Sequence, residues 1–235
     1  MQAANEVHWW QYWGNVAQLA AVVVTGAAVI VALFKEDFIR RRRHPKLTAS
    51  IEAKHPNCVR TSEKKDLPAK PWKGFTYFLS VWVKNQGNVR AEKVEVFLSQ
   101  AWVRSNSTFE PVPNFTPMNL RWSYTHETYV EGISPGMGRL CDFASISDPA
   151  YFSPPQEKTR LSLCLQVPPP STDRLSPGHY KFEIKLAGSN CEPVTCCIHL
   201  HLTGVWDNEP AQMLPHGFTV LVSSGCDSVS PLSAT

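Results

Sequence analysis

The chain has 235 residues, 43% of them hydrophobic, and a formal net charge of +3 at pH 7. Residues 35–46 hold six of the 23 basic residues and two of the 20 acidic ones, and Glu6 is the only other acidic residue before Leu47, so residues 47–235 carry 17 of each and no net charge. A soluble part of this size can bury a sizeable core, and its neutrality argues against a broad nucleic-acid-binding face, which needs an excess of basic residues.

An apolar segment near the N-terminus predicts a membrane-spanning helix. Val16–Phe34 has nineteen residues with no charge and no proline, about the length that a helix needs to cross a hydrocarbon core of ~30 Å. Aromatic residues crowd its first end and basic residues its second: Trp9, Trp10, Tyr12 and Trp13, then Lys35 and Arg40–Arg43. A signal peptide carries its charges before the apolar run, whereas here they follow it.

This arrangement predicts an uncleaved anchor in the inner (plasma) membrane. Arginines stay on the cytoplasmic side of a span, while aromatic rings prefer the headgroup layer. We therefore expect residues 1–13 to be a short external N-terminus with an aromatic belt, 14–39 a transmembrane helix and 40–46 a basic linker. The remainder of the chain is expected in the cytoplasm.

Small and weakly polar residues form a stripe along one side of the predicted helix. They recur at alternating spacings of four and three: Gly14, Gln18, Ala21, Thr25, Ala28 and Ala32. Membrane helices associate through small residues, which let backbones approach closely, and through polar residues, which hydrogen-bond in lipid. Chance is the alternative, because an alanine-rich helix has small residues on every face. The position of Gln18 and Thr25 on the stripe favours a helix interface and a homo-oligomer.

The consecutive arginines Arg40, Arg41, Arg42 and Arg43 have two interpretations. Basic residues beside a span set its orientation and attract anionic lipid, with each charge worth ~1 kcal/mol near the surface. In an oligomer, several copies would also form a cationic ring that meets an anionic ligand or influences ion passage. The first interpretation accounts for the run in full, and the second requires self-association.

Alternation of apolar and polar residues predicts short β-strands in the soluble part. These strands are expected at 47–53, 75–84, 94–103, 140–146, 159–167, 180–186, 194–203 and 218–222. Residues 55–73 are expected to form a loop, and three consecutive prolines at 168–170 end a strand. Residues 223–235 are expected to be a disordered tail. Strands separated by turns, with no convincing soluble helix, predict an all-β sandwich over residues 47–222.

Residues 105–137 interrupt this rhythm with prolines and aromatic residues. The aromatic side chains are Phe109, Phe115, Trp122, Tyr124 and Tyr129, and a short strand is expected within 121–130. A long irregular segment inside a compact domain is often functional. It either covers an open edge of the sandwich or forms a recognition loop with aromatic anchors, and the sequence leaves both open.

Three segments share a pattern of strands and turns: VWVKNQGNVRAEKVEVFL at 81–98, PGMGRLCDF at 135–143 and LSPGHYKFEIKLAGSN at 175–190. This pattern, which covers residues 47–205, resembles bacterial immunoglobulin-like domains of the cell-adhesion-related type. The resemblance implies an immunoglobulin-like β-sandwich preceded by one N-terminal transmembrane helix. It includes no ligand-binding motif and implies no chemistry.

The seven cysteines are odd in number and show no repeated spacing. Cytoplasmic thiols normally stay reduced, which agrees with the predicted orientation. Cys191, Cys196, Cys197, His199 and His201 are residue types that bind metals, but on a strand Cys196 faces the core while Cys197 and the histidines share the other face. Tetrahedral zinc would need further ligands from elsewhere. We therefore expect exposed strand residues and no metal.

Catalytic signals are weak. Gly132–Gly136 matches the spelling G-x-S-x-G of a hydrolase nucleophile elbow, but Pro135 follows Ser134 and has no N–H for an oxyanion hole. The sequence also lacks a glycine-rich phosphate loop and a Cys–His nucleophile signature. These observations predict no enzyme and no cofactor. Sequons at Asn106 and Asn114 test only the topology.

Together these features predict a single-pass membrane protein that oligomerises through its helix. Its cytoplasmic sandwich is expected to sense an unknown ligand or protein, and the helix bundle then gates a pore or disrupts the membrane. One anchor joined to one cytoplasmic sensor resembles, in architecture, the membrane-acting effectors of bacterial antiviral defence. The alternative is a passive tether that docks a partner protein through the sandwich and forms no pore.

Overall fold

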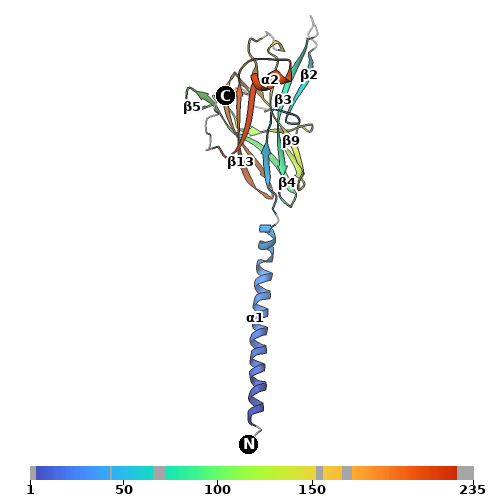
Figure 1. Cartoon of the computed structure of the whole chain (residues 1–235), viewed down its shortest axis with the longest axis vertical. Helices are drawn as coiled ribbons and strands as arrows, with labels where there is room; N and C mark the ends of the chain where they lie inside the picture. Colours follow the sequence, from blue (N-terminus) through green and yellow to red (C-terminus); the bar gives the residue numbers. More distant parts are fainter. Residues whose placement is uncertain (1–3, 43, 66–71, 152–155, 166–170, 227–235) are drawn as a thin grey trace. The chain divides into compact units, whose positions relative to one another are not determined.

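A computed structural model describes residues 4–42, 44–65, 72–151, 156–165 and 171–226. The chain divides into two compact units, Met1–His44 and Pro45–Thr235 (Figure 1). The first unit is one long helix and the second is a β-sandwich, as the sequence predicts.

The helical unit is a single α-helix, α1, that runs from Ala4 to Arg42. It contains no proline, and it ends shortly before Pro45, because the residue that precedes a proline is disfavoured in helical conformation. The helix extends beyond the expected transmembrane bounds 14–39 at both ends. Arg40–Arg42, within the basic linker expected at 40–46, are helical, while Arg43 lies outside the described residues.

One part of α1 has the properties of a membrane span. Val16–Lys35 has a mean hydropathy of 2.4, and none of it is buried against the rest of the protein. Within the described ranges, it is the one helical segment long and apolar enough to cross a bilayer. A signal sequence near an N-terminus meets the same criteria of length and apolar composition, so these two properties do not distinguish an anchor from a signal sequence.

The second unit consists of two sheets in which all the strand pairs are antiparallel. Sheet A has the order β1-β3-β9-β10-β11, with β2 on β3 and β7 on β9. Its strands are β1 (Leu47–Ser50), β2 (Cys58–Lys65), β3 (Trp72–Asn85), β7 (Arg121–Trp122), β9 (Gly138–Ser147), β10 (Arg160–Leu163) and β11 (Arg174–Leu175). Sheet B has the order β14-β13-β12-β4-β5, with β6 and β8 on β4. Its strands are β4 (Ala91–Ser105), β5 (Thr108–Pro111), β6 (Met118–Asn119), β8 (Tyr129–Ile133), β12 (Gly178–Gly188), β13 (Cys191–Leu202) and β14 (Phe218–Ser224).

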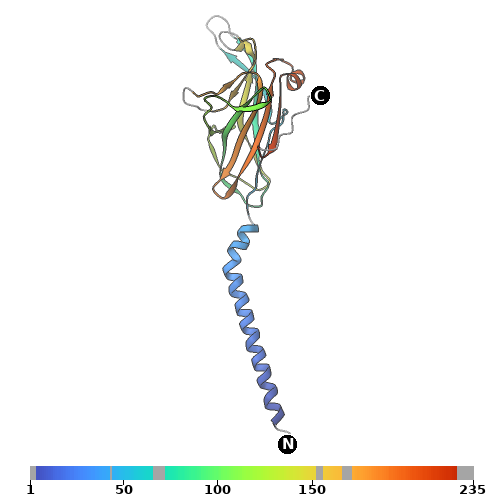
Figure 2. The same cartoon turned by 90° about the vertical axis from the view of Figure 1, so that its left-hand side faces the viewer.

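The sheets pack face to face around one apolar core (Figure 2). Successive side chains of a strand point to opposite sides, so every second residue of the central strands is buried. Leu79 and Val81 on β3 and Phe182 on β12 are fully buried, as the alternation predicts. The Phe143 ring on β9 meets the Phe182 ring edge to face, with the ring centroids 5.2 Å apart. This contact joins the two sheets.

Two segments contain more strands than were predicted, although β7 lies within the short strand expected at 121–130. β2 lies where a loop was expected, and it pairs with the first part of β3, from Cys58 opposite Leu79 to Lys65 opposite Trp72. Its polar sequence hides the alternation on which the prediction relied. The 105–137 segment is also ordered into strands: β5, β6 and β8 pair with β4, and β7 pairs with β9.

The C-terminal region also differs from the prediction. A short helix, α2 (Pro210–His216), precedes β14 and buries Met213, and a single 3₁₀ turn, η1, spans Pro149–Tyr151. Ser223 and Ser224 belong to β14, so the last strand extends beyond residue 222. Cys226 is held by a disulfide. The expected disordered tail is therefore wrong for residues 223–226, and residues 227–235 lie outside the described part of the chain.

Candidate functional site

The small-residue stripe follows one side of α1, as its spacing requires. All six residues of the stripe are exposed: Gly14, Gln18, Ala21, Thr25, Ala28 and Ala32. The Thr25 hydroxyl donates to the Ala21 carbonyl of the preceding turn at 2.7 Å. This bond satisfies the hydroxyl within its own helix, so Thr25 needs no partner in a second helix, and Gln18 is the residue of the stripe whose polarity favours association.

Gly26 is a feature of α1 that the sequence reasoning missed. Together with Ala21, Val22, Thr25, Val29 and Ile30, it lines a shallow hollow on the helix surface. A Cβ added at Gly26 would meet no atom within 4 Å. At ~100° per residue, the hollow lies on the flank of the stripe, so the surface open to another helix is wider than the stripe.

The aromatic residues of 105–137 do not form one surface. Trp122, on β7, has 1% of its surface exposed and lies in the core, so including it in a recognition loop is wrong. Phe115 is partly buried and also packs against the core. Tyr124 is 90% exposed, in the turn that follows β7.

The remaining two aromatic residues lie far apart. Phe109 on β5 pairs with Arg104, whereas Tyr129 on β8 pairs with Glu95. Because these two positions of β4 are nine residues apart, they are separated by about 30 Å. Phe109 and Tyr129 are both partly exposed, but no single small ligand can contact both.

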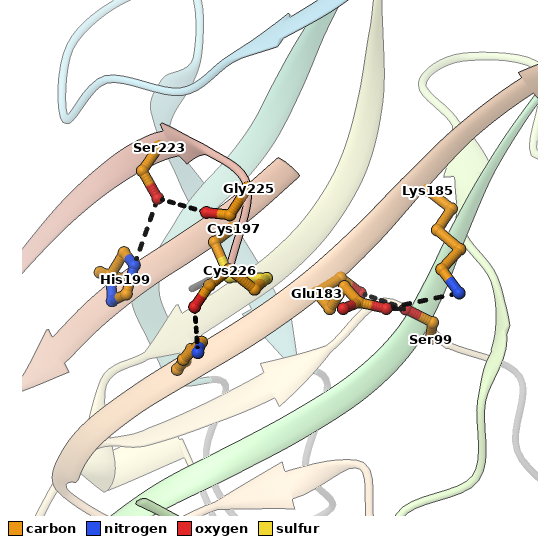
Figure 3. Close-up of a disulfide and its surroundings, with 9 residues drawn as sticks. Ser99, Glu183, Lys185, Cys197, His199, Ser223, Gly225 and Cys226 are labelled. Atoms are coloured by element: carbon orange, nitrogen blue, oxygen red, sulfur yellow. Dashed lines mark hydrogen bonds and ion pairs between the residues drawn. A yellow bond between two sulfur atoms is a disulfide. The ribbon is translucent and has the colours of Figure 1, made fainter. Parts of the chain in front are cut away.

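The outward side of sheet B gathers the histidines. Cys196 is buried in the core and His199 and His201 lie half-buried on the opposite side, as predicted. Cys197 is not exposed, however: it is fully buried and forms a disulfide with Cys226 (Figure 3). The sequence reasoning paired neither cysteine, because it expected cytoplasmic thiols to stay reduced.

His179, which the sequence reasoning did not single out, completes this cluster. It lies opposite His201 in the β12–β13 register, and the two imidazole rings stack with their centroids 3.7 Å apart and their planes at 4°. The alternation of β12 from His179 to Lys185 would have placed His179 outward. The match to His201 depends on the register between two strands, which alternation does not provide.

Burial and positive neighbours lower the pKa values of these histidines. For His179 the causes are burial, then the His201 ring and the Arg104 guanidinium. For His199 they are burial and the Lys181 ammonium, and for His201 burial alone. The three imidazoles are therefore neutral at neutral pH and take up protons at a lower pH than an exposed histidine.

The neighbourhood of the disulfide is polar. The Lys181 ammonium lies 5.0 Å from the centre of the Trp102 ring and donates to the Cys226 carbonyl. The Ser223 hydroxyl lies 3.5 Å from His199 Nε2 and donates to the Gly225 carbonyl at 3.2 Å (Figure 3). A disulfide and hydrogen bonds therefore hold Gly225 and Cys226, which follow β14, against the outward side of sheet B.

The described thiols are poor nucleophiles. Burial raises the pKa of Cys58 to about 11 and that of Cys164, together with the Asp142 carboxylate, to about 12. The pKa of Cys141 is raised well above its usual value for the same reasons. Since the thiolate is the reactive form, none of these groups is activated for nucleophilic catalysis.

The G-x-S-x-G segment forms a turn. The Met137 N–H donates to the Ser134 carbonyl at 3.1 Å, and Gly136 has a φ of +74° between β8 and β9. A nucleophile elbow requires a strand followed by a helix, and here two strands flank the turn. In the described ranges, no group of three or more His, Cys, Asp or Glu side chains has a metal-binding arrangement.

Comparisons of the chain with protein-family models, with curated proteins and with solved structures found no match.

Proposed function

We propose that this chain is a single-pass membrane protein that assembles through α1 and uses its sandwich as a cytoplasmic recognition domain. A ligand or partner bound by the sandwich then causes the helix bundle to open a pore or disrupt the membrane. We also assign the sandwich to the bacterial immunoglobulin-like type and the whole protein to the membrane-acting effectors of bacterial antiviral defence, on the sequence and architectural resemblances alone.

One observation carries this proposal: Val16–Lys35 of α1 is long and apolar enough to cross a membrane. Along Val16–Lys35, a whole helix of mean hydropathy 2.4 presents its side chains outward. Burial of apolar side chains in lipid or in other helices is worth ~25 cal/mol per Å², so an aqueous environment is strongly disfavoured. The long uninterrupted helix favours an anchor over a cleaved signal sequence. The position of the basic residues also favours an anchor, because they follow the apolar run, whereas a signal peptide carries its charges before the run.

The arginine run and the disulfide point to different compartments. The basic run Arg40–Arg43 supports a cytoplasmic sandwich, because basic residues are enriched on the cytoplasmic side of a span. A disulfide such as Cys197–Cys226 persists in oxidising compartments and is rare in the cytoplasm. We give priority to the arginine run, because basic residues next to a span act directly on its insertion. In this orientation Cys197 and Cys226 lie in a reducing compartment and stay as free thiols until an oxidant converts them to the disulfide.

The passive tether is the second candidate, and one observation favours it. A pore needs polar groups that face its lumen, and the Thr25 hydroxyl is already bonded to the Ala21 carbonyl. Gln18 is then the principal polar group of the stripe. An assembly with so few polar groups can hold sandwiches together without conducting ions.

The test combines assembly and flux. The full chain is reconstituted in nanodiscs to measure its oligomeric state and in liposomes that contain an ion-sensitive dye to measure ion flux. Ala21→Leu and Ala28→Leu should shift the oligomer towards monomer, because a larger side chain keeps the helix backbones apart. Ala27→Leu is the matched control: it makes the same substitution ~140° from the centre of the stripe and should leave the oligomer intact.

Two outcomes separate the candidates. An oligomer that stays ion-tight, including in lysate from phage-infected cells, supports the tether and rejects the pore. A monomer in nanodiscs, or equal effects of Ala21→Leu and Ala27→Leu, rejects assembly through the stripe. Val22 and Val29 are unsuitable controls, because both line the hollow beside Gly26.

A further inference from the structure

Two rows of side chains on the outward side of sheet B define what we call the histidine face. One row consists of Thr219, His201, His179, Arg104 and Phe109. The registers pair Thr219 with His201, His201 with His179 and Arg104 with Phe109, and His179 and Arg104 are the next residues beyond the Tyr180–Val103 pair of β12 and β4. The same registers place the adjacent row at Leu221, His199, Lys181, Trp102 and Pro111. With strands ~4.8 Å apart, the face is about 19 Å wide.

The histidine face is rich in cationic groups and contains no carboxylate. Its ten positions hold Arg104, Lys181 and three histidines, and no Asp or Glu. The next position along β12 is Glu183, whose carboxylate is already engaged: it accepts a hydrogen bond from Ser99 at 2.6 Å and lies 3.5 Å from the Lys185 ammonium (Figure 3). The face is therefore complementary to negative charge.

The charge of the face increases as the pH falls. The His179 and His201 rings stack as neutral imidazoles beside Arg104, and His199 lies between Lys181 on β12 and Leu221 and Ser223 on β14. Protonation of the three rings adds up to three positive charges to those of Arg104 and Lys181. Each new charge repels its cationic neighbours, so an anionic partner relieves this repulsion and favours protonation.

Apolar side chains flank the cationic groups. Leu221 is 51% exposed on β14 and Phe109 is 38% exposed on β5, at the two ends of the rows. A phosphate or a single small anion would contact none of this apolar surface. Because residues 47–235 carry no net charge, the sandwich also lacks the long-range positive field that brings nucleic acids to basic proteins.

We propose that the histidine face binds an acidic segment of a partner protein, in which carboxylates are interspersed with apolar side chains, and that binding tightens on acidification. The carboxylates meet Arg104, Lys181 and the protonated histidines, while the apolar side chains cover Leu221 and Phe109. This inference rests on the proposed recognition role of the sandwich and names the chemistry of its partner.

The test uses the full chain with its disulfide intact, in nanodiscs of phosphatidylcholine. The probe is a fluorescein-labelled peptide of Glu-Leu-Glu-Ser repeats, and its Kd is measured by fluorescence anisotropy at pH ~7.5 and pH ~5.5, where glutamate is still ionised. The ion pairs that the protonated histidines add should lower the Kd about tenfold at the lower pH. A peptide with Gln in place of Glu should not respond to pH.

Variants locate the effect. Arg104→Gln should weaken binding severalfold at both pH values, and the double variant His179→Gln/His201→Gln should remove most of the pH response. His216→Gln is the matched control, because it removes an exposed histidine on α2, outside the face. Urea unfolding of each variant shows whether the sandwich is still folded. If the double variant unfolds, Arg104→Gln carries the test alone.

Three results would overturn the proposal: equal binding of the Glu and Gln peptides, a Kd that does not change with pH, or tighter binding of an oligothymidylate, which would assign the face to nucleic acid. The oligomeric state is measured without a partner and does not depend on the face, whereas partner-triggered ion flux does. A failed peptide experiment with an intact oligomer therefore rejects only this inference. Peptide binding by a monomeric, ion-tight protein rejects the pore and assembly but retains the recognition face.

Discussion

Breaking the Cys197–Cys226 disulfide should destabilise the sandwich by an amount that its position determines. The two cysteines are separated by 29 residues in sequence. In the chain-entropy account, a closed loop of that length lowers the entropy of the unfolded chain by ~12 cal/mol/K, which is about 3.5 kcal/mol near room temperature. In the folded state, Cys197 already pairs with Ser223, so the bond acts mainly on the unfolded chain.

The assay is urea unfolding of the full chain in detergent micelles, followed by tryptophan fluorescence with and without reductant. With a slope of ~2 kcal/mol/M, the oxidised protein should unfold at roughly 1.5–2 M more urea than the reduced protein. Cys226→Ser should match the reduced protein and ignore reductant. Cys191→Ser, which removes a half-buried free thiol, should keep the full response. A midpoint that reductant does not change would refute the reasoning.

Three further predictions concern packing, pH and topology. Phe182→Ala should lower the free energy of unfolding by ~3–5 kcal/mol, because it removes a buried ring from the contact with Phe143. Lys185→Ala, on the outward side of the same strand, should change it little, and equal urea midpoints for the two variants would show that the strand register is wrong. The free energy of unfolding should fall as the pH drops through ~6.5, because the unfolded chain protonates its histidines before the folded histidine face does; a flat pH profile would contradict this. Protease added to intact cells should leave residues 47–235 uncut. A glycan on Asn106 after expression in a eukaryotic host would show that the sandwich lies on the opposite side of the membrane from the one predicted.

Local sequence patterns were sufficient for the central strands and for the helix. The strands β3, β12 and β13 alternate apolar and polar residues, so burial of one side fixes their conformation and their core side chains. The Val16–Phe34 run is apolar on every side, which only a lipid-exposed or fully buried helix can accommodate.

Features that depend on pairing between distant segments were beyond local patterns. β2 is polar and becomes a strand because β3 offers it an edge. The stacked pair His179 and His201 depends on the β12–β13 register, and the disulfide depends on β14 bringing Cys226 beside Cys197. Trp122 was misassigned because an aromatic residue in an irregular segment looks the same in sequence whether it anchors a partner or fills the core.

The lengths of the outermost strands have a consequence for an assembled protein. Helices that hold several sandwiches together raise their local concentration to the millimolar range, where unpaired strand edges readily join into aggregates. The outer strands of sheet A are β11 with two residues, β1 with four and β2 with eight. Sheet B ends in β5, with four residues, and in β14, with seven. Of the two longer outer strands, β2 has a polar sequence, whereas β14 contains no charged residue that would oppose pairing with another copy. In an assembled protein, β14 is therefore the edge at which neighbouring sandwiches can join.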